Sequence, residues 1–389
     1  MLKKIIFLFL IIFIIPITIL LWIYFGIIVS AETMRFFKAS DSDNYNPKKC
    51  YRSACIKGYE NEDWANKFFY EYKELKYMFS DYTLWKTSEY SGETINILSP
   101  ENIRKTFKPN VLKSNKKAFF FGGSTAWGLG AKDDLTLPSL FAKKYNIETF
   151  NYAQNAWTSS QNLIELTKTI SSGKKLDYVF FLEGLNDANM LCTSKQNKKN
   201  FVSSVRDNYQ EKIYNQDVKS TSIDNILSTF RSFITFTKYK LIKDYHFKRN
   251  VKKFSSIEYV CHEDNDKNNK ATNFLIQNWK QAKILTEKTG GKFFVILQPI
   301  SYFDNTKMNH LLDIHKLGKK NVSLKLSTIA FYNEVVRKLK DEDFFIDAKD
   351  IFENKYEYIH IDYGGHFLPK GYNDILNKID SKLESNNIY

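Results

Sequence analysis

Short apolar runs alternate along the C-terminal three quarters of the chain with stretches in which apolar residues recur every three or four positions. The short runs predict five strands, at Ala118–Phe121, Thr149–Ala153, Tyr178–Leu182, Phe293–Leu297 and Phe344–Ile346. The amphipathic stretches predict helices, at Leu137–Tyr145, Gln161–Ile170, Asn273–Thr289, Thr328–Leu339 and Tyr372–Leu383. Such alternation is typical of a parallel sheet covered by helices on both faces. We therefore expect an α/β domain over residues 111–389, a three-layer sandwich around a five-stranded parallel sheet.

A second pattern marks the N-terminus. The run from Ile5 to Val29 has no charged residue and is longer than the roughly 20 residues that cross a bilayer. Lys3 and Lys4 precede it and Glu32 follows it, which predicts a cytoplasmic tail at 1–4, one transmembrane helix at 5–29, and export of the rest. A signal peptide cleaved near Val29-Ser30-Ala31 is the alternative, although its apolar region would be unusually long. Both interpretations place the remaining chain outside the cytoplasm, at the cell (inner) membrane if the helix is retained.

Two regions lack the alternation. Residues 30–110 are polar and rich in tyrosine, and we expect a membrane-proximal stalk and cap with a helix over Glu60–Met78. Residues 195–266 are basic and separate the third strand from the fourth. This insertion is either a helical addition packed on the domain or a lid and substrate platform.

The cysteines agree with export, because an even number in an oxidising compartment permits disulfides. We expect Cys50 to pair with Cys55, and Cys192 with Cys261, among three ways of pairing the four cysteines. Their spacing, with only His262 nearby, is poor for zinc. The sequence therefore predicts no metal and no cofactor.

The net charge is +14 at pH 7, with 57 Lys and Arg against 43 Asp and Glu. Nucleic acid is the usual partner of such a charge, but export makes it an unsuitable one. Anionic lipid headgroups or anionic glycans are better matches for an exported basic surface.

The first segment with candidate chemistry is Phe121-Gly122-Gly123-Ser124-Thr125, directly after the first predicted strand. A serine at a strand-to-helix turn can expose its hydroxyl, and its N–H can face a developing oxyanion. A helix cap or a phosphate-binding loop is the alternative, but the Gly-Lys-Ser/Thr of a phosphate loop is absent.

Two further segments complete the set. Gly184-Leu185-Asn186-Asp187 follows the third strand, where the Asn186 amide can face an oxyanion or the pair can simply cap a helix. Near the C-terminus, Asp362 and His366 lie in one loop. Histidine is the usual base for a serine nucleophile, and a carboxylate fixes its tautomer.

In this order, the three segments resemble the blocks of the SGNH (GDSL-like) hydrolase superfamily, from about Lys116 to the C-terminus with the insertion between them. The resemblance implies a flavodoxin-like fold in which Ser124 attacks an acyl carbonyl and His366 accepts its proton. It also implies an oxyanion hole formed by the N–H of Ser124, a backbone N–H of Ala156, and the Asn186 side chain. Trp127, Gly184 and Asp187 belong to the same blocks, and we expect them to contact substrate.

The chain departs from the family pattern at three positions. Gly123 stands where the family has aspartate, and Ala156 where it has glycine. The family's D-x-x-H spacing falls on Tyr363, whereas Asp362 lies four residues before His366, so Asp362 is the expected acid only if Gly364-Gly365 bulges. An α/β-hydrolase elbow, G-x-S-x-G, is the competing pattern, and Ala126 breaks it.

These observations predict an exported serine esterase or O-acyltransferase, acting through a Ser124 acyl-enzyme on an acyl group, in the first place acetyl, of a cell-envelope glycan. Two alternatives stay open. One is a lipid esterase or lysophospholipase that uses the insertion as a lid. The other is a non-catalytic binding or assembly protein of the same fold at the membrane.

Overall fold

The computed structural model describes residues 50–51, 53–194, 206–210, 212–213, 257–304, 306–311, 322–355 and 357–385, together with 15, 17–18, 22, 24 and 26. The chain forms two units, 1–46 with 215–252 and 47–214 with 253–389. The first unit, with most of the predicted anchor at 5–29, lies almost entirely outside the described residues. Among the residues that are described, no helix is both long enough and apolar enough to span a membrane.

The five predicted strands form the parallel core of one sheet. Their spatial order is β10-β9-β8-β6-β7, which is the order 2-1-3-4-5 of flavodoxin-like folds. The central β8 is buried at every position, as expected for a strand covered by helices on both faces. Their bounds are β6 Lys117–Gly122, β7 Glu148–Asn151, β8 Tyr178–Glu183, β9 Lys292–Leu297 and β10 Phe345–Asp347.

The prediction of a five-stranded sheet was wrong in number, because three antiparallel strands continue the sheet beyond β7. They are β5 (Ile103–Arg104), β4 (Asn96–Leu98) and β3 (Tyr90–Ser91), so the sheet has eight strands within the described residues. Strands of two or three residues are too short to produce a recognisable alternation. The boundary expected at residue 110 therefore does not coincide with an edge of the sheet.

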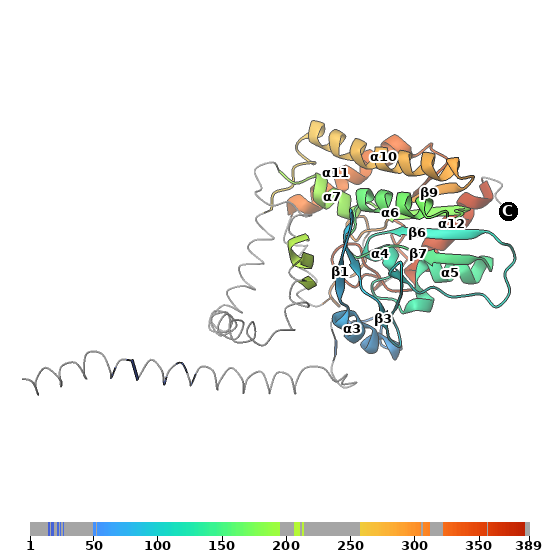
Figure 1. The fold of residues 1–389 in the computed structure, drawn as a ribbon. Coiled ribbons are helices and arrows are strands. Elements are labelled where there is room, and N and C mark those ends of the chain that lie inside the picture. The colour runs from blue at the N-terminus through green and yellow to red at the C-terminus, as the bar shows by residue number, and fades with distance from the viewer. Residues whose placement is uncertain are drawn as a thin grey trace, which may run out of the picture. The chain divides into compact units, whose positions relative to one another are not determined.

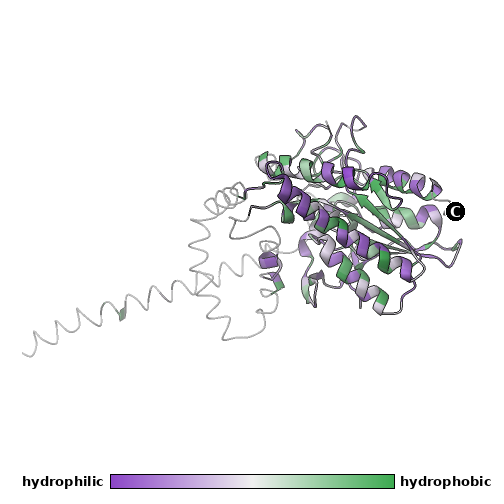
Figure 2. Ribbon diagram, turned by 90° about the horizontal axis from the view of Figure 1, so that it is seen from above, coloured by the Kyte–Doolittle hydropathy of each residue, from purple (hydrophilic) through white to green (hydrophobic). Residues whose placement is uncertain are grey.

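Helices cover both faces of the parallel strands, as Figure 1 shows for the group above the sheet. On one face, α10 (Asn265–Lys288) packs on α6 (Ser159–Ser171), α7 (Leu185–Leu191) and α11 (Val322–Leu339). On the other face, α12 (Gly371–Ser385) packs on α5 (Leu137–Tyr145). Figure 2 shows mostly hydrophobic strands between helices of mixed character, the arrangement that buries an apolar core.

The segment before the sheet begins with a helix and a hairpin. The helix predicted over 60–78 is shorter, because α3 covers Trp64–Glu74 and the chain then becomes strand β1 (Tyr77–Ser80). Strand β1 pairs antiparallel with β2 (Leu84–Thr87) as a separate two-stranded ribbon. A short 3-10 turn (Asp133–Leu135) precedes α5.

Both expected disulfides are present, Cys50–Cys55 and Cys192–Cys261. The second closes the base of the insertion, where Thr193 and Tyr259 also form an antiparallel bridge. Within the insertion, the described residues 206–210 and 212–213 are helical, and Tyr209 stacks on Trp85 with ring centres 4.8 Å apart. This contact agrees with a packed addition; most of the insertion lies outside the described residues.

Candidate active site

The candidate site lies where the strand order reverses, between the carboxyl ends of β6 and β8. Ligands of open parallel sheets bind at this position, because the connections leave in opposite directions and open a crevice. Ser124 begins the short helix α4 (Ser124–Trp127) two residues after β6, and Asn186 lies in the first turn of α7 just after β8. The topology therefore brings the first two predicted segments to one point.

Ser124, His366 and Asp362 form a continuous series of hydrogen-bonded side chains, the arrangement that a serine nucleophile, its base and an orienting acid require. The distance from Ser124 Oγ to His366 Nε2 is 2.6 Å. On the other side of the ring, His366 Nδ1 forms a short hydrogen bond with Asp362 Oδ2. The side chains of His366 and Asp362 are 20% and 23% exposed, so substrate and water can reach the dyad. This relay leaves Nε2 free to accept the serine proton.

A hairpin explains why a four-residue spacing brings Asp362 to His366. The His366 carbonyl accepts a hydrogen bond from Ile361 N–H at 3.1 Å, and the Ile359 carbonyl accepts one from Leu368 N–H at 2.8 Å. Residues 362–365 are therefore the turn of an antiparallel pair, and its two ends face each other. Asp362 follows Ile361 directly, so its carboxylate meets the histidine across the turn. Tyr363, at the family's acid position, packs on Tyr302 instead.

Asn186 is held beside the nucleophile by a backbone contact. Its Nδ2 donates to the carbonyl of Trp157 at 2.8 Å, and since an amide nitrogen carries two protons, a second N–H remains. A Cβ placed on Gly123 would lie 2.6 Å from this nitrogen. The absence of a side chain at Gly123 is therefore what permits the close approach of Asn186. The departure from the family's aspartate has a direct structural consequence.

Ala156 keeps the backbone shape that glycine would supply. Its φ is +62°, in the left-handed region where alanine costs roughly 1–2 kcal/mol. Neither the N–H of Ala156 nor that of Ser124 donates to a backbone acceptor in the part of the chain that is described. Both are therefore available as donors, and Ala156 directly precedes the Trp157 carbonyl that holds Asn186.

The structure places Trp127, which we expected to contact substrate, in the core. Its side chain is fully buried, with the guanidinium of Arg104 4.1 Å from its ring centre and the edge of Tyr72 on another side. Arg104 also donates to the carbonyls of Trp127, Gly128 and Ala131. Trp127 thus belongs to the core that fixes the loop behind the nucleophile.

Gly184 and Asp187, which we also expected to contact substrate, make close contacts within the fold. Gly184 has φ +132°, and a side chain there would meet Leu297 and the Tyr332 hydroxyl, both at 2.8 Å. The buried Asp187 carboxylate accepts from the N–H of Ser159 at 3.1 Å and from its hydroxyl at 2.6 Å, which caps α6. Burial raises the pKa of Asp187 to about 6.

Sequence reasoning missed the residues that join the nucleophile turn to the histidine loop. The Thr125 hydroxyl donates to the Gly365 carbonyl at 2.9 Å, and Gln298 Nε2 lies 3.3 Å from the same hydroxyl. The Tyr372 hydroxyl donates to the Thr125 carbonyl at 2.8 Å. Of these residues, only Thr125 could have been singled out from the sequence, because it directly follows Ser124.

A second Asp–His pair supports the same hairpin. His360 Nε2 lies 2.5 Å from Asp304 Oδ2, and both side chains are buried. Burial alone would raise the pKa of Asp304, but the hydrogen bond and charge of His360 outweigh it, and the pKa is lowered. His360 pairs with Phe367 in the strand beside His366, so this buried pair holds the strand that carries the triad.

A buried carboxyl group lies behind the nucleophile strand. Glu183 accepts from Asn162 Nδ2 at 2.6 Å and from Trp279 Nε1 at 2.5 Å, and Asn162 Oδ1 accepts the N–H of Gly122 at 3.1 Å. Burial, and then the charge of Asp187, raise the pKa of Glu183 well above its usual range. These bonds tie the end of β6 to α6 and α10.

In the described part of the chain, no cluster of three or more His, Cys, Asp or Glu is arranged to hold a metal.

No family model and no curated protein matches the sequence. Solved structures with similar folds include a member of the lipolytic G-D-S-L family from Veillonella parvula, at 8% identity and a TM-score of 0.34, covering 68% of this chain and 95% of that one. An aryl esterase of M. smegmatis aligns at 13% identity and a TM-score of 0.35, covering 69% and 99%. A carbohydrate acetylesterase from Sinorhizobium meliloti aligns at 12% identity and a TM-score of 0.36, covering 70% and 99%. Because all three TM-scores are below 0.5, the functional assignment depends on the side-chain geometry described above.

Proposed function

We propose that the chain is an exported serine esterase or O-acyltransferase that acts through a Ser124 acyl-enzyme on an acylated, in the first place acetylated, glycan of the cell envelope. The observation that supports the chemistry is the uninterrupted relay from Ser124 Oγ through His366 to Asp362. A non-catalytic protein of the same fold has no need to keep these three groups aligned at a partly exposed position.

In the proposed reaction, Ser124 Oγ attacks the acyl carbonyl carbon while His366 Nε2 takes the hydroxyl proton. The carbonyl oxygen becomes an oxyanion, which the N–H groups of Ser124 and Ala156 and the free amide proton of Asn186 stabilise. Collapse of the tetrahedral intermediate breaks the ester C–O bond, and the departing sugar oxygen takes the proton from His366. Water then attacks the acyl-enzyme in an esterase, or a second sugar hydroxyl attacks it in a transferase.

The proposed setting is the extracytoplasmic side of the cell membrane, with the chain anchored by its N-terminal apolar run. Support comes from the uncharged segment Ile5–Val29 and from two disulfides, which persist in oxidising compartments. The excess of positive charge suits a surface that works next to anionic glycans or lipid headgroups. Protease accessibility of intact and permeabilised cells tests the orientation.

Hydrolysis of aryl esters tests the proposed chemistry. The purified full-length protein should hydrolyse p-nitrophenyl acetate, and both Ser124→Ala and His366→Ala should lower kcat by several orders of magnitude. Equal activity in all three proteins would overturn the assignment. A series of acyl lengths separates substrate classes, since preference for acetyl supports a glycan ester and preference for long chains supports a lipid.

A further inference from the structure

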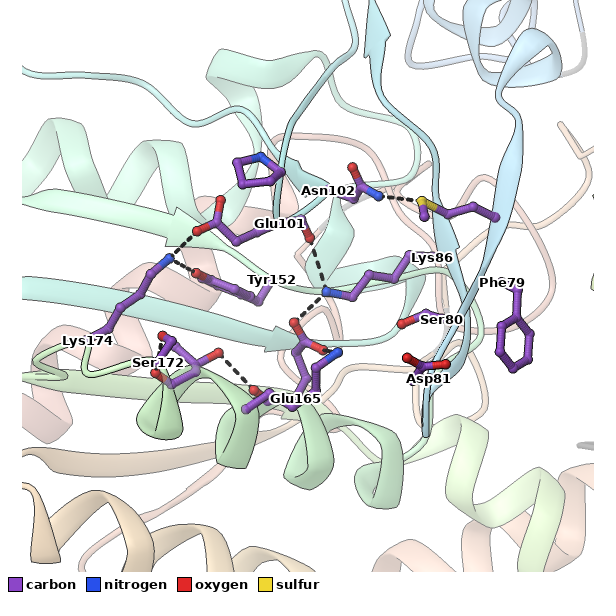
Figure 3. A pocket seen from close by; sticks show the side chains of 14 residues that line it. Phe79, Ser80, Asp81, Lys86, Glu101, Asn102, Tyr152, Glu165, Ser172 and Lys174 are labelled. Carbon is purple, nitrogen blue, oxygen red and sulfur yellow. Dashed lines mark hydrogen bonds and ion pairs between the residues drawn. The ribbon is translucent and has the colours of Figure 1, made fainter.

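A cavity of about 380 Å³ lies between the β1–β2 hairpin and α6 (Figure 3). The hairpin forms one wall, the turn at 100–102 and Tyr152 form another, and α6 with Lys174 forms the third. It is separate from the triad, but one loop borders both sites. Tyr152 begins that loop and lines the cavity, while Trp157 ends it and its carbonyl holds Asn186. The ammonium of Lys86 lies 6.0 Å from the Trp157 ring centre.

Charged groups in this cavity are balanced and held in place. Lys86 Nζ donates to Glu165 Oε1 at 2.5 Å and to the Glu101 carbonyl at 3.1 Å. Lys174 Nζ donates to Glu101 Oε1 at 2.7 Å and to the Tyr152 hydroxyl at 2.6 Å. Figure 3 shows these groups pointing toward one another from opposite walls. In total, three ammonium groups and three carboxylates line the space: Lys86, Lys168, Lys174, Asp81, Glu101 and Glu165.

Hydrogen-bonding capacity remains unused at the centre of this arrangement. Glu165 is 3% exposed, and its Oε2 has no hydrogen-bond partner among the residues that the structure describes. Lys168 Nζ lies 3.7 Å from this oxygen, beyond hydrogen-bond distance. Lys86 uses two of its three protons on the acceptors named above. A buried ion pair with an open acceptor costs desolvation energy, so stability alone does not explain it.

The charges and hydrogen-bonding groups of the lining determine which class of ligand the cavity can bind. A ligand with a strong charge gains nothing from three positive and three negative groups, whereas a hydroxyl group can donate to Glu165 and accept from Lys86 at once. Met78, which lies opposite Lys86 on the hairpin and is 43% exposed, adds an apolar side chain to the lining that can cover the C–H face of a sugar ring. We propose that the cavity binds a neutral sugar unit of a glycan. That this sugar belongs to the ester substrate of Ser124 rests on the proposed function; the binding itself does not.

Binding of unmodified oligosaccharides to the full-length Ser124→Ala protein tests the cavity without turnover. The probes are chitohexaose and cellohexaose, which are neutral, and a hexagalacturonate, which is anionic, measured by isothermal titration calorimetry. At least one neutral hexasaccharide should bind with a Kd of about 1 mM or tighter, and more tightly than the hexagalacturonate. Glu165→Gln and Met78→Ala should each weaken that binding about fivefold or more.

Tyr82→Ala is the matched control, because Tyr82 is on the same hairpin, is 80% exposed, and does not line the cavity. It should leave the affinity unchanged, and thermal unfolding shows that each variant is folded. The proposal is overturned if neither neutral probe binds, if the anionic probe binds best, or if Met78→Ala and Glu165→Gln in folded protein bind like Tyr82→Ala. Absence of esterase activity in the wild type would overturn the proposed function and leave this binding result to stand by itself.

Discussion

Replacing Gly123 by alanine should disable the oxyanion hole without touching the triad. The added Cβ would lie 2.6 Å from Asn186 Nδ2, where ordinary contacts begin at 3.4 Å, so the amide must move by about 0.8 Å (3.4 − 2.6). The backbone itself is no obstacle, since φ −85° and ψ −159° suit alanine. Loss of one oxyanion donor costs ~10²–10³ in kcat, and a misplacement of ~1 Å up to ~10². We therefore expect kcat to fall about 10- to 100-fold with KM little changed.

A double-mutant cycle on p-nitrophenyl acetate hydrolysis decides whether this loss acts through Asn186. Asn186→Ala alone should lower kcat about 100-fold, and adding Gly123→Ala should lower it little further. The coupling would then be roughly 1.4–2.7 kcal/mol. Losses that multiply in the double variant, or an unchanged kcat in Gly123→Ala, would refute the reasoning. Gly290→Ala, in the turn before β9, strains the backbone because φ is +82° but meets nothing within 4 Å; it controls for general destabilisation and should keep the wild-type kcat.

Three further predictions concern the supports of the site. Asp362→Asn should lower kcat for the aryl acetate by ~10³–10⁴, since the amide no longer fixes the histidine tautomer; an activity within tenfold of wild type would exclude it as the triad acid. The lowered pKa of Asp304 stabilises the fold above pH ~3.9 and that contribution is lost as pH falls through the folded pKa. Asp304→Asn should thus cost about 3 kcal/mol in urea unfolding at pH 7 because His360 loses its buried partner, and less near pH 3; a difference independent of pH contradicts this. Removing the Cys192–Cys261 disulfide, whose cysteines are 69 residues apart, should cost roughly 4 kcal/mol in the same assay, and a loss below about 1 kcal/mol would show that the denatured chain is not constrained by it.

The parallel core was predictable because its strands are buried on both faces and therefore form continuous apolar runs. β8 is buried at all six positions, and a run such as Tyr178–Leu182 has no amphipathic alternative. The antiparallel extension was not predictable, because β3 and β5 are two residues long and are defined by their partners rather than by a pattern.

The triad was predictable as residue types in order, but its geometry was not. Ser124 and His366 stand in recognisable sequence blocks. Whether the Asp362 carboxylate reaches His366 depends on the pairing of 359–361 with 366–368, which forms only when the chain folds. The position of a residue in such a sequence block also does not tell whether its side chain points toward the site or into the core. Trp127 and Asp187 are neighbours of functional residues in the sequence, yet both side chains point into the core.

Buried polar pairs between residues far apart in the sequence could not be predicted. Asp304 and His360 are 56 residues apart, and Lys86 and Glu165 are 79 apart, so no local spacing marks either pair. Their burial, which makes them energetically important, becomes visible only when the elements pack. The only local hint is His360 between Ile359 and Ile361, a pattern typical of a short strand.

The central claim is that Ser124 is an activated nucleophile, and covalent labelling tests it most directly. Folded full-length protein is treated with a fluorophosphonate probe and the modified peptide is identified by mass spectrometry. We predict one adduct on Ser124, abolished in Ser124→Ala and strongly slowed in His366→Ala. A folded protein that does not label, or that labels at another serine, would contradict the account.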